Sequence, residues 1–408
     1  MKIIILFFYR PIYFILKHLL ILLKPVLDDK SRLWIQLRQE NPQLSNLKDK
    51  TIWLHASSGE IEYLKSFIRD YKKANPEVSV VVSYSSPSAT RLFDNIKSSV
   101  DIFFPMPWDQ PGKIQNLLHQ IKPEACYFGR TDLWPEFIYQ LSKNNVKSYI
   151  ISYNPSLGFF NRIWSRIFLK NFKAIFCTHQ TQENILKEIL PQSVNVVNAG
   201  DTRFDQVFWR LQQPTKIAFQ FAEPYFVFGS TWKEDEYVFI PQLTELKKLG
   251  YKIVISPHEI EANAILRLEK VLMQLNLTYQ KLSDMNSVDV DVILVDKIGY
   301  LADFYRLADA AFIGGSFKSK VHSVMEPLCC AIPVITGPYI YNSPEAMKYH
   351  QVIINELRVV QTVQNGDQFQ DAVKRIKSIQ KNDFKKLLIG NLEKNRYATK
   401  KIMNLISD

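Results

Sequence analysis

The stretch Thr51-Ile52-Trp53-Leu54-His55-Ala56-Ser57-Ser58-Gly59-Glu60 joins a short apolar run to a turn that carries a glutamate. The second half of the chain holds a counterpart, in which Gly314-Gly315-Ser316 precedes His322-Ser323-Val324-Met325-Glu326-Pro327. Each glutamate comes soon after a strand-like run and close to the start of a helical pattern. The carboxyl ends of parallel strands present ligand sites at such places. The two stretches therefore predict two α/β sheets, each with a site at its edge.

Strand-like runs alternate with helical patterns around the first stretch. Amphipathic patterns at 61–73, 113–121 and 135–143 lie between six apolar runs, at Thr51–Ala56, Val78–Tyr84, Asp101–Phe104, Ala125–Gly129, Val146–Ser152 and Ala174–Cys177. Regular alternation of this kind predicts a parallel, doubly wound sheet with helices on both faces.

A second series of apolar runs begins near residue 225. Helical patterns at 234–249 and 261–275 accompany runs at Tyr225–Gly229, Lys252–Ser256, Val290–Val295, Ala310–Ile313 and Pro333–Thr336. The stretch 211–222 has no strand pattern, so we expect the boundary there, and 408 residues are too many for one core. The expected organisation is an N-terminal helix at 1–30, Rossmann-like domains at 31–212 and 213–380, and a C-terminal helix at 381–408. In folds with two such domains, the GT-B architecture, the last helix often crosses back to the first domain.

Charge and cysteine usage narrow the class of protein. The chain has 51 basic and 40 acidic residues, a net charge of +11 that suits an anionic membrane, a phosphorylated substrate or a nucleic acid. The basic residues are scattered and no nucleic-acid-binding motif accompanies them, so we expect no nucleic-acid partner. The four cysteines and seven histidines show neither C-x-x-C nor H-E-x-x-H spacing. We expect buried free thiols and no metal site.

The N-terminal segment 1–30 is predicted to be a membrane anchor. Residues 3–23 are mostly apolar, no small-residue cleavage site follows, and Pro11 and Pro25 suit the start and end of a helix over about 11–24. Arg10, Lys17 and Lys24 recur every seven residues and form one narrow stripe. We interpret this as a helix in the inner-leaflet interface, with the cations at lipid phosphates. A spanning helix and a buried core helix are the alternatives, although a span would bury Arg10 and Lys17 in lipid.

Six segments in this order give the chain a resemblance to the 3-deoxy-D-manno-oct-2-ulosonic acid (Kdo) transferases of lipopolysaccharide synthesis. The segments are His55–Glu60, Asp132–Pro135, Gly200–Asp205, Ser230–Glu236, Pro257–Ile260 and Gly314–Pro338. The resemblance implies a GT-B glycosyltransferase at the cytoplasmic face of the inner membrane. Its donor would be CMP-Kdo and its acceptor a lipid A precursor (lipid IVA), with anionic inner-membrane lipids as further partners. The reaction would be inverting and would use no metal and no cofactor besides the donor substrate.

The resemblance also implies catalytic roles for Glu60, Asp132 and Arg203. Glu60 would be the general base, because a carboxylate on a tight turn at a strand end can take the proton of an incoming hydroxyl. Its alternative role is to stabilise a helix N-terminus. Arg203 would hold a carboxylate or phosphate in the transition state, and its alternative is a surface ion pair with Asp201 or Asp205. Asp132 stands where the family usually has glutamate, about one methylene longer.

In the second domain, the resemblance assigns the CMP nucleotide to three segments. Backbone N–H groups after Gly314-Gly315-Ser316, near a helix start at Ser323, would bind its phosphate. Glu326, one turn inside that helix, would accept both ribose hydroxyls, although a tight turn and a helix-start carboxylate explain these residues equally well. The assigned nucleotide-binding residues are Pro257, His258, Ile298, Gly299, Tyr300, Ser323, Val324, Met325 and Glu326.

The chain also departs from the family's pattern. An arginine expected after Ser152 is absent from Ser152-Tyr153-Asn154-Pro155-Ser156, His258 follows Pro257 where arginine is more common, and Tyr300 replaces a frequent acidic residue. These changes concern the acceptor and the identity of the sugar. A GT-B transferase for another nucleotide sugar, a nucleotide-sugar epimerase and a catalytically inactive membrane scaffold are therefore alternative functions.

Overall fold

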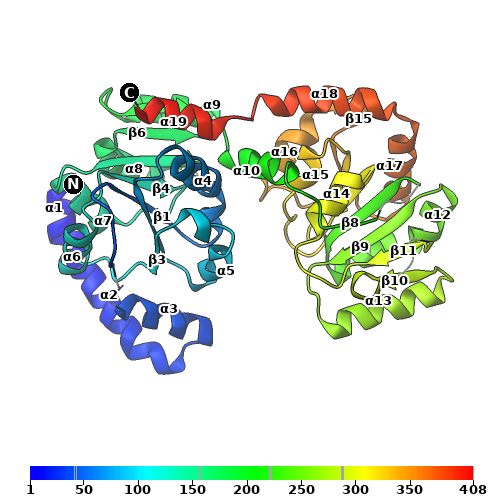
Figure 1. Cartoon of the computed structure of the whole chain (residues 1–408), viewed down its shortest axis with the longest axis horizontal. Helices are drawn as coiled ribbons and strands as arrows, with labels where there is room; N and C mark the ends of the chain where they lie inside the picture. Colours follow the sequence, from blue (N-terminus) through cyan, green and yellow to red (C-terminus); the bar gives the residue numbers. More distant parts are fainter. Residues whose placement is uncertain (41, 43, 156–157, 220–222, 286–288, 408) are drawn as a thin grey trace. The chain divides into compact units, whose positions relative to one another are not determined.

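The computed structural model describes residues 1–40, 42, 44–155, 158–219, 223–285 and 289–407. The chain forms two compact units, Met1–Gln206 with Asn395–Asp408, and Val207–Lys394 (Figure 1). The division falls inside helix α10 (Thr202–Leu211). The four segment boundaries expected above remain a prediction, and residues 220–222 of the expected break lie outside the described residues.

The first unit contains a seven-stranded sheet in the order β3-β2-β1-β4-β5-β6-β7. All its neighbouring strands are parallel, so their carboxyl ends meet at one edge. The strands are β1 Thr51–Ala56, β2 Ser79–Tyr84, β3 Ile102–Pro105, β4 Ala125–Gly129, β5 Lys147–Tyr153, β6 Ala174–Cys177 and β7 Asn195–Asn198.

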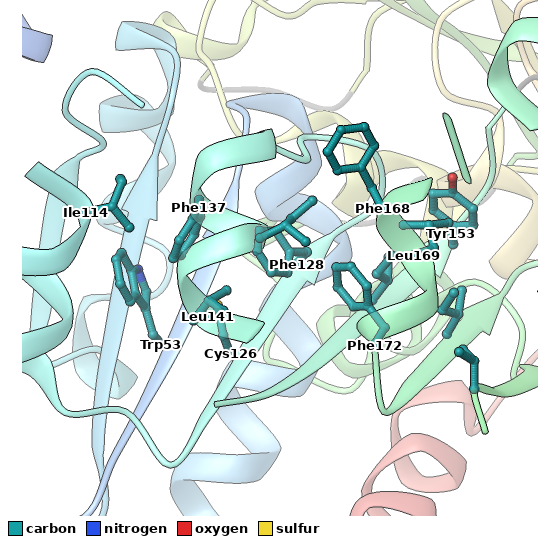
Figure 2. Close-up of a cluster of buried hydrophobic side chains, with 14 of the residues drawn as sticks. Trp53, Ile114, Cys126, Phe128, Phe137, Leu141, Tyr153, Phe168, Leu169 and Phe172 are labelled. Carbon is teal, nitrogen blue, oxygen red and sulfur yellow. The ribbon is translucent and has the colours of Figure 1, made fainter. Parts of the chain in front are cut away.

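Helices cover both faces of this sheet because successive strand residues point to opposite sides. Trp53 packs on one face with Phe128 and Phe137, beneath helices α6 to α8 (Figure 2). Leu54 packs on the other face, with Phe67 of α4 and Ile402 of α19. The helices of this unit are α3 Asp29–Gln39, α4 Lys65–Ala74, α5 Thr90–Phe93, α6 Pro111–Ile121, α7 Pro135–Lys143, α8 Phe159–Phe168, α9 Gln180–Ile189 and α19 Ala398–Ser407.

The second unit repeats the architecture with the strand order β10-β11-β9-β8-β12-β13-β16, again all parallel. Its strands are β8 Tyr225–Thr231, β9 Lys252–Pro257, β10 Tyr279–Lys281, β11 Val292–Leu294, β12 Ala310–Ile313, β13 Val334–Thr336 and β16 Val360–Thr362, with a separate hairpin of β14 Ile353–Ile354 and β15 Leu357–Arg358. Its helices are α11 Lys233–Phe239, α12 Leu243–Lys248, α13 Ala262–Gln274, α14 Leu301–Leu307, α15 Met325–Cys329, α16 Pro344–Gln351, α17 Gly366–Ser378 and α18 Lys381–Glu393. The predicted fold class, two doubly wound parallel sheets of the GT-B type with an N-terminal apolar helix, is confirmed.

Two helices predicted as continuous are interrupted. The pattern at 234–249 divides into α11 and α12 around a 3₁₀ turn at Ile240–Gln242, because Pro241 has no N–H to continue the α-helical ladder. The pattern at 381–408 divides into α18 and α19. The backbone N–H groups of Tyr397 and Thr399, at the start of α19, donate to the Asp205 carboxylate at 2.7 and 2.6 Å. The capping carboxylate thus fixes the start of the last helix on the first unit.

The N-terminal helical segment runs from Lys2 to Val26 and is long and apolar enough to cross a membrane. It begins earlier than predicted, as α1 (Lys2–Ile4), a π-helical turn (Ile5–Tyr9) and α2 (Arg10–Leu23), before a 3₁₀ turn at Lys24–Val26. The π-helical turn directly precedes Pro11, which lacks the N–H that a regular helix needs at that position. The proline therefore lies inside the helical segment rather than at its start.

Two of the three cations of the predicted stripe, Arg10 and Lys17, contact the protein, which corrects for these two the prediction that they meet lipid phosphates. Arg10 donates from Nε and Nη2 to Glu136 at 2.8 and 2.9 Å, and the Glu136 side chain is fully buried. Lys17 Nζ donates to Gln110 at 3.1 Å, and Tyr9 donates its hydroxyl to the buried Asp109 at 2.7 Å. The outward side is apolar, with large exposed side chains at Ile12, Phe14, Ile15, Leu16, Leu19, Leu22 and Leu23.

Candidate active site

Glu60 lies at the carboxyl edge of the first sheet, on the 3₁₀ turn Gly59–Tyr63 that follows β1. Thr131, from the loop after the neighbouring strand β4, donates to Glu60 Oε1 from its backbone N at 3.1 Å and from its hydroxyl at 2.5 Å. Glu60 Oε2 is buried and has no hydrogen-bond partner among the described residues. One oxygen is thus fixed, and the other leaves its hydrogen-bonding capacity unused within the described residues.

The surroundings of Glu60 favour its basic role. Burial raises the pKa of Glu60 above the ordinary glutamate value, and the nearby Asp132 charge raises it further. The Thr131 hydrogen bonds and the Arg130 guanidinium oppose this rise without cancelling it. A carboxylate with a raised pKa binds a proton more readily, which a general base requires.

Asp132 lies beside Glu60, and its pKa is shifted in the opposite direction. It accepts hydrogen bonds from the Ser85 hydroxyl and, at 3.0 Å, from the Trp134 indole, and His55 Nε2 lies 3.2 Å from its Oδ2. This contact is short, although the His55 ring is not well directed for a hydrogen bond there. Burial would raise the pKa of Asp132, but His55, Ser85 and Arg38 outweigh it and hold that pKa below the usual value. The two neighbouring carboxylates therefore differ in basicity, as acid–base pairs in enzymes do.

Arg38 is a site residue that sequence patterns do not reveal. Its guanidinium is almost fully buried, with Cζ 4.2 Å from the Trp34 ring and 4.5 Å from the Trp134 ring, and it donates to the carbonyl oxygens of Pro107 and Ser85. Arginine stacked on aromatic faces keeps its charge at low desolvation cost. That positive charge helps to lower the pKa of Asp132. The sequence shows only that Trp34 lies four residues before Arg38 on α3. This spacing does not indicate a contact with Asp132.

Arg203 lies at the start of α10, after β7, and is paired with Asp201. Arg203 Nη2 is 2.6 Å from Asp201 Oδ2, Nε is 3.1–3.2 Å from both oxygens, and the backbone N of Arg203 also donates to Oδ1 at 2.9 Å. Its Cζ lies 4.3 Å from the centre of the Tyr63 ring. Of the two ion pairs considered above, the structure has the one with Asp201, because Asp205 instead caps α19. The catalytic role of Arg203 remains a prediction.

A buried group of hydroxyls fixes the backbone of this segment. Thr202 donates its hydroxyl to the Tyr63 carbonyl at 2.5 Å, and its Oγ1 lies 2.9 Å from the Ser152 hydroxyl. Ser66 donates to the Thr202 carbonyl at 3.1 Å and also contacts Thr399 of α19 at 2.7 Å. Ser152 has a left-handed backbone, with φ of 55°. These contacts do not show what stands in for the arginine absent after Ser152, and Ser156 lies outside the described residues.

In the second unit, Asp235 ties together the loops at the carboxyl ends of β8 and β12. Its Oδ2 accepts the backbone N–H of Trp232 and of Gly315, both at 2.8 Å, and burial raises the pKa of this aspartate. A Cβ at Gly314 would lie 2.5 Å from the Ser230 carbonyl oxygen, so only glycine fits there. The Gly315 N–H, expected to bind phosphate, is engaged by Asp235. Thr231 Oγ1 and Ser316 Oγ are buried without a partner among the described residues.

His258 lies in an aromatic group at the same edge. The rings of His258 and His322 stack with centroids 4.2 Å apart, and His258 also stacks on Trp232 at 4.7 Å. Trp232 donates its indole N–H to His322 Nε2 at 2.8 Å, and Lys318 Nζ lies 3.2 Å from the centre of the Trp232 ring. Burial lowers the pKa of His322 to about 4, and burial also lowers that of His258. The lowered pKa values favour neutral rings, and the positive charge here comes from Lys318 and Lys320.

Glu326 is the second residue of α15, which begins at Met325 rather than near Ser323. The glutamate therefore lies in the first helical turn, not one turn inside. Its Oε1 accepts from Arg210 Nη1 of α10 at 2.7 Å, and both side chains are partly exposed. The charge of Glu326 also adds to the burial that raises the pKa of Tyr305. Like Arg38, Arg210 is a residue near the candidate site that the sequence patterns did not reveal.

The other predicted nucleotide residues lie at the same carboxyl edge. Pro257 ends β9, and Ser323 and the buried Val324 precede α15. Ile298, which is exposed, and Gly299 with φ of 92° form the loop after β11, and Tyr300 caps α14. The contacts above join His258 with His322 and Glu326 with Arg210. Within the described part of the chain, no group of three or more His, Cys, Asp and Glu side chains is arranged to hold a metal ion.

Two doubly wound parallel sheets, with the candidate residues in loops at their carboxyl edges, define a GT-B-like fold. Residues 31–206 match the family model described as 3-deoxy-D-manno-octulosonic-acid transferase (kdotransferase). This match confirms the resemblance to the Kdo transferases that the motifs predicted.

Individual relatives support the assignment. The chain is 28% identical to a 3-deoxy-D-manno-octulosonic acid transferase of Chlamydophila psittaci, over 72% of this chain and 70% of the relative. It is 26% identical to a bifunctional glycosyltransferase/methyltransferase of Fusobacterium nucleatum, over 90% of this chain and 59% of that longer protein. Among solved structures, a UDP-GlcNAc 2-epimerase from Neisseria meningitidis bound to UDP-GlcNAc shares the fold, with a TM-score of 0.61 and 15% identity over 88% of this chain and 100% of that one.

Proposed function

We propose that the protein transfers Kdo from CMP-Kdo to a lipid A precursor, lipid IVA, with Glu60 as the general base. The observation that carries this proposal is the Glu60 carboxylate, with one oxygen held by Thr131 and the other buried without a partner among the described residues. A base must be fixed, reachable by a hydroxyl and basic enough to take its proton. Glu60 is fixed by Thr131 and has a raised pKa, and it lies within the segment that matches the family.

In the proposed reaction, Glu60 Oε2 removes the proton of the acceptor hydroxyl as that oxygen attacks the anomeric carbon of Kdo. The bond from that carbon to the CMP phosphate breaks, and the electron pair leaves with CMP. Attack from the face opposite the phosphate inverts the anomeric centre. The proton ends on Glu60 and passes to solvent. The low pKa of Asp132 keeps a negative charge beside Glu60, which favours protonation of the base as the reaction proceeds.

The second unit would hold the nucleotide. Glu326 can accept two ribose hydroxyls, and the Arg210 ion pair orients its carboxylate before binding. Lys318 supplies a positive charge near Trp232 and His258, in the region where the CMP phosphate is expected. Arg203, oriented by Asp201, would stabilise negative charge on the donor.

The N-terminal helical segment would place the first unit at the cytoplasmic face of the inner membrane. Its apolar side is exposed, and its cations Arg10 and Lys17 are engaged by the protein. We infer that the helix lies in the interface with its apolar side towards the acyl chains, where the lipid acceptor is found.

The test is incubation of the full chain with CMP-Kdo and tetraacylated lipid A precursor in detergent micelles, followed by mass spectrometry of the lipid. The expected product carries added Kdo, and CMP is released in equal amount. Parallel incubations with UDP- and CMP-linked sugars other than Kdo address the alternative of another donor. Transfer from one of those, with none from CMP-Kdo, would overturn the proposal.

A further inference from the structure

Arg130 has an unusual backbone conformation beside Glu60. It directly follows β4, with φ of 57°, and its N–H donates to the Ile151 carbonyl at 2.9 Å. Residues other than glycine are strained in this left-handed region, and such strain gathers at functional sites. Glycine would adopt this conformation without strain. The backbone fold therefore does not explain why an arginine stands at this position.

The Arg130 guanidinium forms no ion pair with a carboxylate of the described residues, although its charge acts on Glu60. Its Cζ lies 5.2 Å from the centre of the Tyr63 ring, whose other cationic neighbour is Arg203. Nε is buried and makes no hydrogen bond, and within the described residues the side chain forms no ion pair. Arg203 and Arg10, by contrast, each bind a carboxylate through two nitrogen atoms. A buried donor without a partner is costly, which indicates a place for a ligand.

The position of Arg130 relates this ligand to Glu60. The next residue, Thr131, holds Glu60 Oε1, and the Arg130 charge acts on the Glu60 carboxylate. A molecule whose hydroxyl reaches Glu60 Oε2 thus has a guanidinium beside it. Guanidinium groups bind phosphate through two parallel hydrogen bonds.

We propose that Arg130 binds a phosphate group of the same acceptor molecule whose hydroxyl Glu60 deprotonates. This inference rests on the proposed function. It makes Arg130 a residue that selects phosphorylated acceptors and aligns the hydroxyl with the base. The residue stands in the first unit, with Glu60, whereas the predicted nucleotide residues belong to the second unit.

Three variants and one control test the proposal. Arg130→Gln removes the charge, Arg130→Lys keeps the charge without the planar pair of donors, and Arg130→Gly removes the side chain while relieving the backbone. Arg166→Gln removes an exposed arginine of α8 as the control. Direct binding of tetraacyl disaccharide bisphosphate and of its phosphatase-treated form is measured in micelles, together with KM and kcat for acceptor and donor.

We expect Arg130→Gln and Arg130→Gly to lose about 10- to 100-fold in affinity for the phosphorylated acceptor, Arg130→Lys to lose less, and Arg166→Gln none. For the dephosphorylated acceptor, Arg130→Gln and the unaltered protein should bind equally. Arg130→Gly should melt at the same or a higher temperature, which a merely structural role of the arginine would not allow.

Unchanged acceptor affinity in Arg130→Gln would overturn the inference. A rise confined to the donor KM would assign the guanidinium to the carboxylate of the sugar, and would equally contradict the acceptor assignment. Absence of transfer by the unaltered protein is a failure of the proposed function. This failure can be distinguished from failure of the inference about Arg130, because comparing the binding of the two acceptor forms needs no turnover.

Discussion

Thr131 donates two hydrogen bonds to Oε1 of Glu60 and none to Oε2. The two residues come from neighbouring loops, after β4 and β1, so the pairing exists only because these strands are adjacent and parallel. Held in this way, the carboxylate loses rotational freedom before substrate arrives. Pre-organisation of a base reduces the entropy cost of reaching the transition state.

Replacing Glu60 by glutamine should reduce turnover by at least about 100-fold, because the amide cannot accept the proton. The amide oxygen can still accept from Thr131, so the melting temperature and the CMP affinity should stay unchanged. Mass spectrometry of the lipid product measures turnover, thermal unfolding gives the melting temperature, and calorimetric titration gives the CMP affinity. Substantial remaining activity would remove Glu60 from the role of base.

Replacing Thr131 by valine should shift the pH dependence of transfer. The Thr131 hydrogen bonds stabilise the ionised form and lower the pKa of Glu60, so losing the hydroxyl raises that pKa. A base with a higher pKa stays protonated to a higher pH, and the acidic limb of the kcat/KM profile should move upward. Thr131→Ser, which keeps the hydroxyl, is the matched control. A downward shift in the valine variant would contradict this account.

Replacing Glu326 by alanine should weaken CMP binding by about 10- to 100-fold, through the loss of hydrogen bonds between a charged acceptor and the ribose hydroxyls. The comparison is Glu393→Ala, which removes an exposed glutamate of α18 in the same unit. Calorimetric titration with CMP gives both affinities. Equal affinities in the two variants would place the ribose elsewhere.

Replacing Arg10 by methionine should lower the free energy of unfolding by about 2–3 kcal/mol. The variant leaves the buried Glu136 carboxylate without its cation, and the effect is smaller than for a fully buried pair because Arg10 is partly exposed. Lys24→Met changes the same charge on the same helical segment without breaking an ion pair of the described residues. Denaturant unfolding in detergent measures both. Equal stabilities would show that the helix does not depend on Glu136 for its docking.

Replacing Gly314 by alanine should destabilise the second unit by about 1–3 kcal/mol and weaken CMP binding, since the new methyl group meets the backbone of Ser230 and Thr231. Gly390→Ala is the control. That glycine lies in α18 with open space around it, and alanine there should stabilise by about 0.5–1 kcal/mol. Opposite signs in thermal unfolding are the expected result, and a tolerated Gly314→Ala would refute the close approach.

The sequence predicts the central strands well, whereas of the four edge strands it predicts only β3 and misses β7, β10 and β16. Strands β1, β4, β6 and β12 have the predicted bounds, because each is a short apolar run between polar turns. Strand β7 was not predicted, since only Val196 and Val197 are apolar among its four residues, and β16 was missed for a similar reason. An edge strand needs less apolar surface, so its pattern is weaker.

The residues of the candidate site likewise divide into those that the sequence predicts and those that only the fold reveals. Glu60, Asp132 and Arg203 could be found because they stand in short local motifs. Arg130, Arg38 and Arg210 could not, because what matters for each is a partner or its absence across the fold, such as Trp134 near Arg38. Similarly, the regular spacing of Arg10, Lys17 and Lys24 indicates a stripe but not what it faces. Only the fold brings Glu136 to Arg10.

Three side chains of the N-terminal helical segment bind the first unit. The contacts are Tyr9 with Asp109, Arg10 with Glu136 and Lys17 with Gln110, and they oppose movement of the segment relative to this unit. A lipid bilayer that takes up its outer side would hold the first unit at a set height and tilt. The edge with Glu60 would then meet glycolipid headgroups at a constant depth, and an acceptor could be modified while its acyl chains remain in the leaflet.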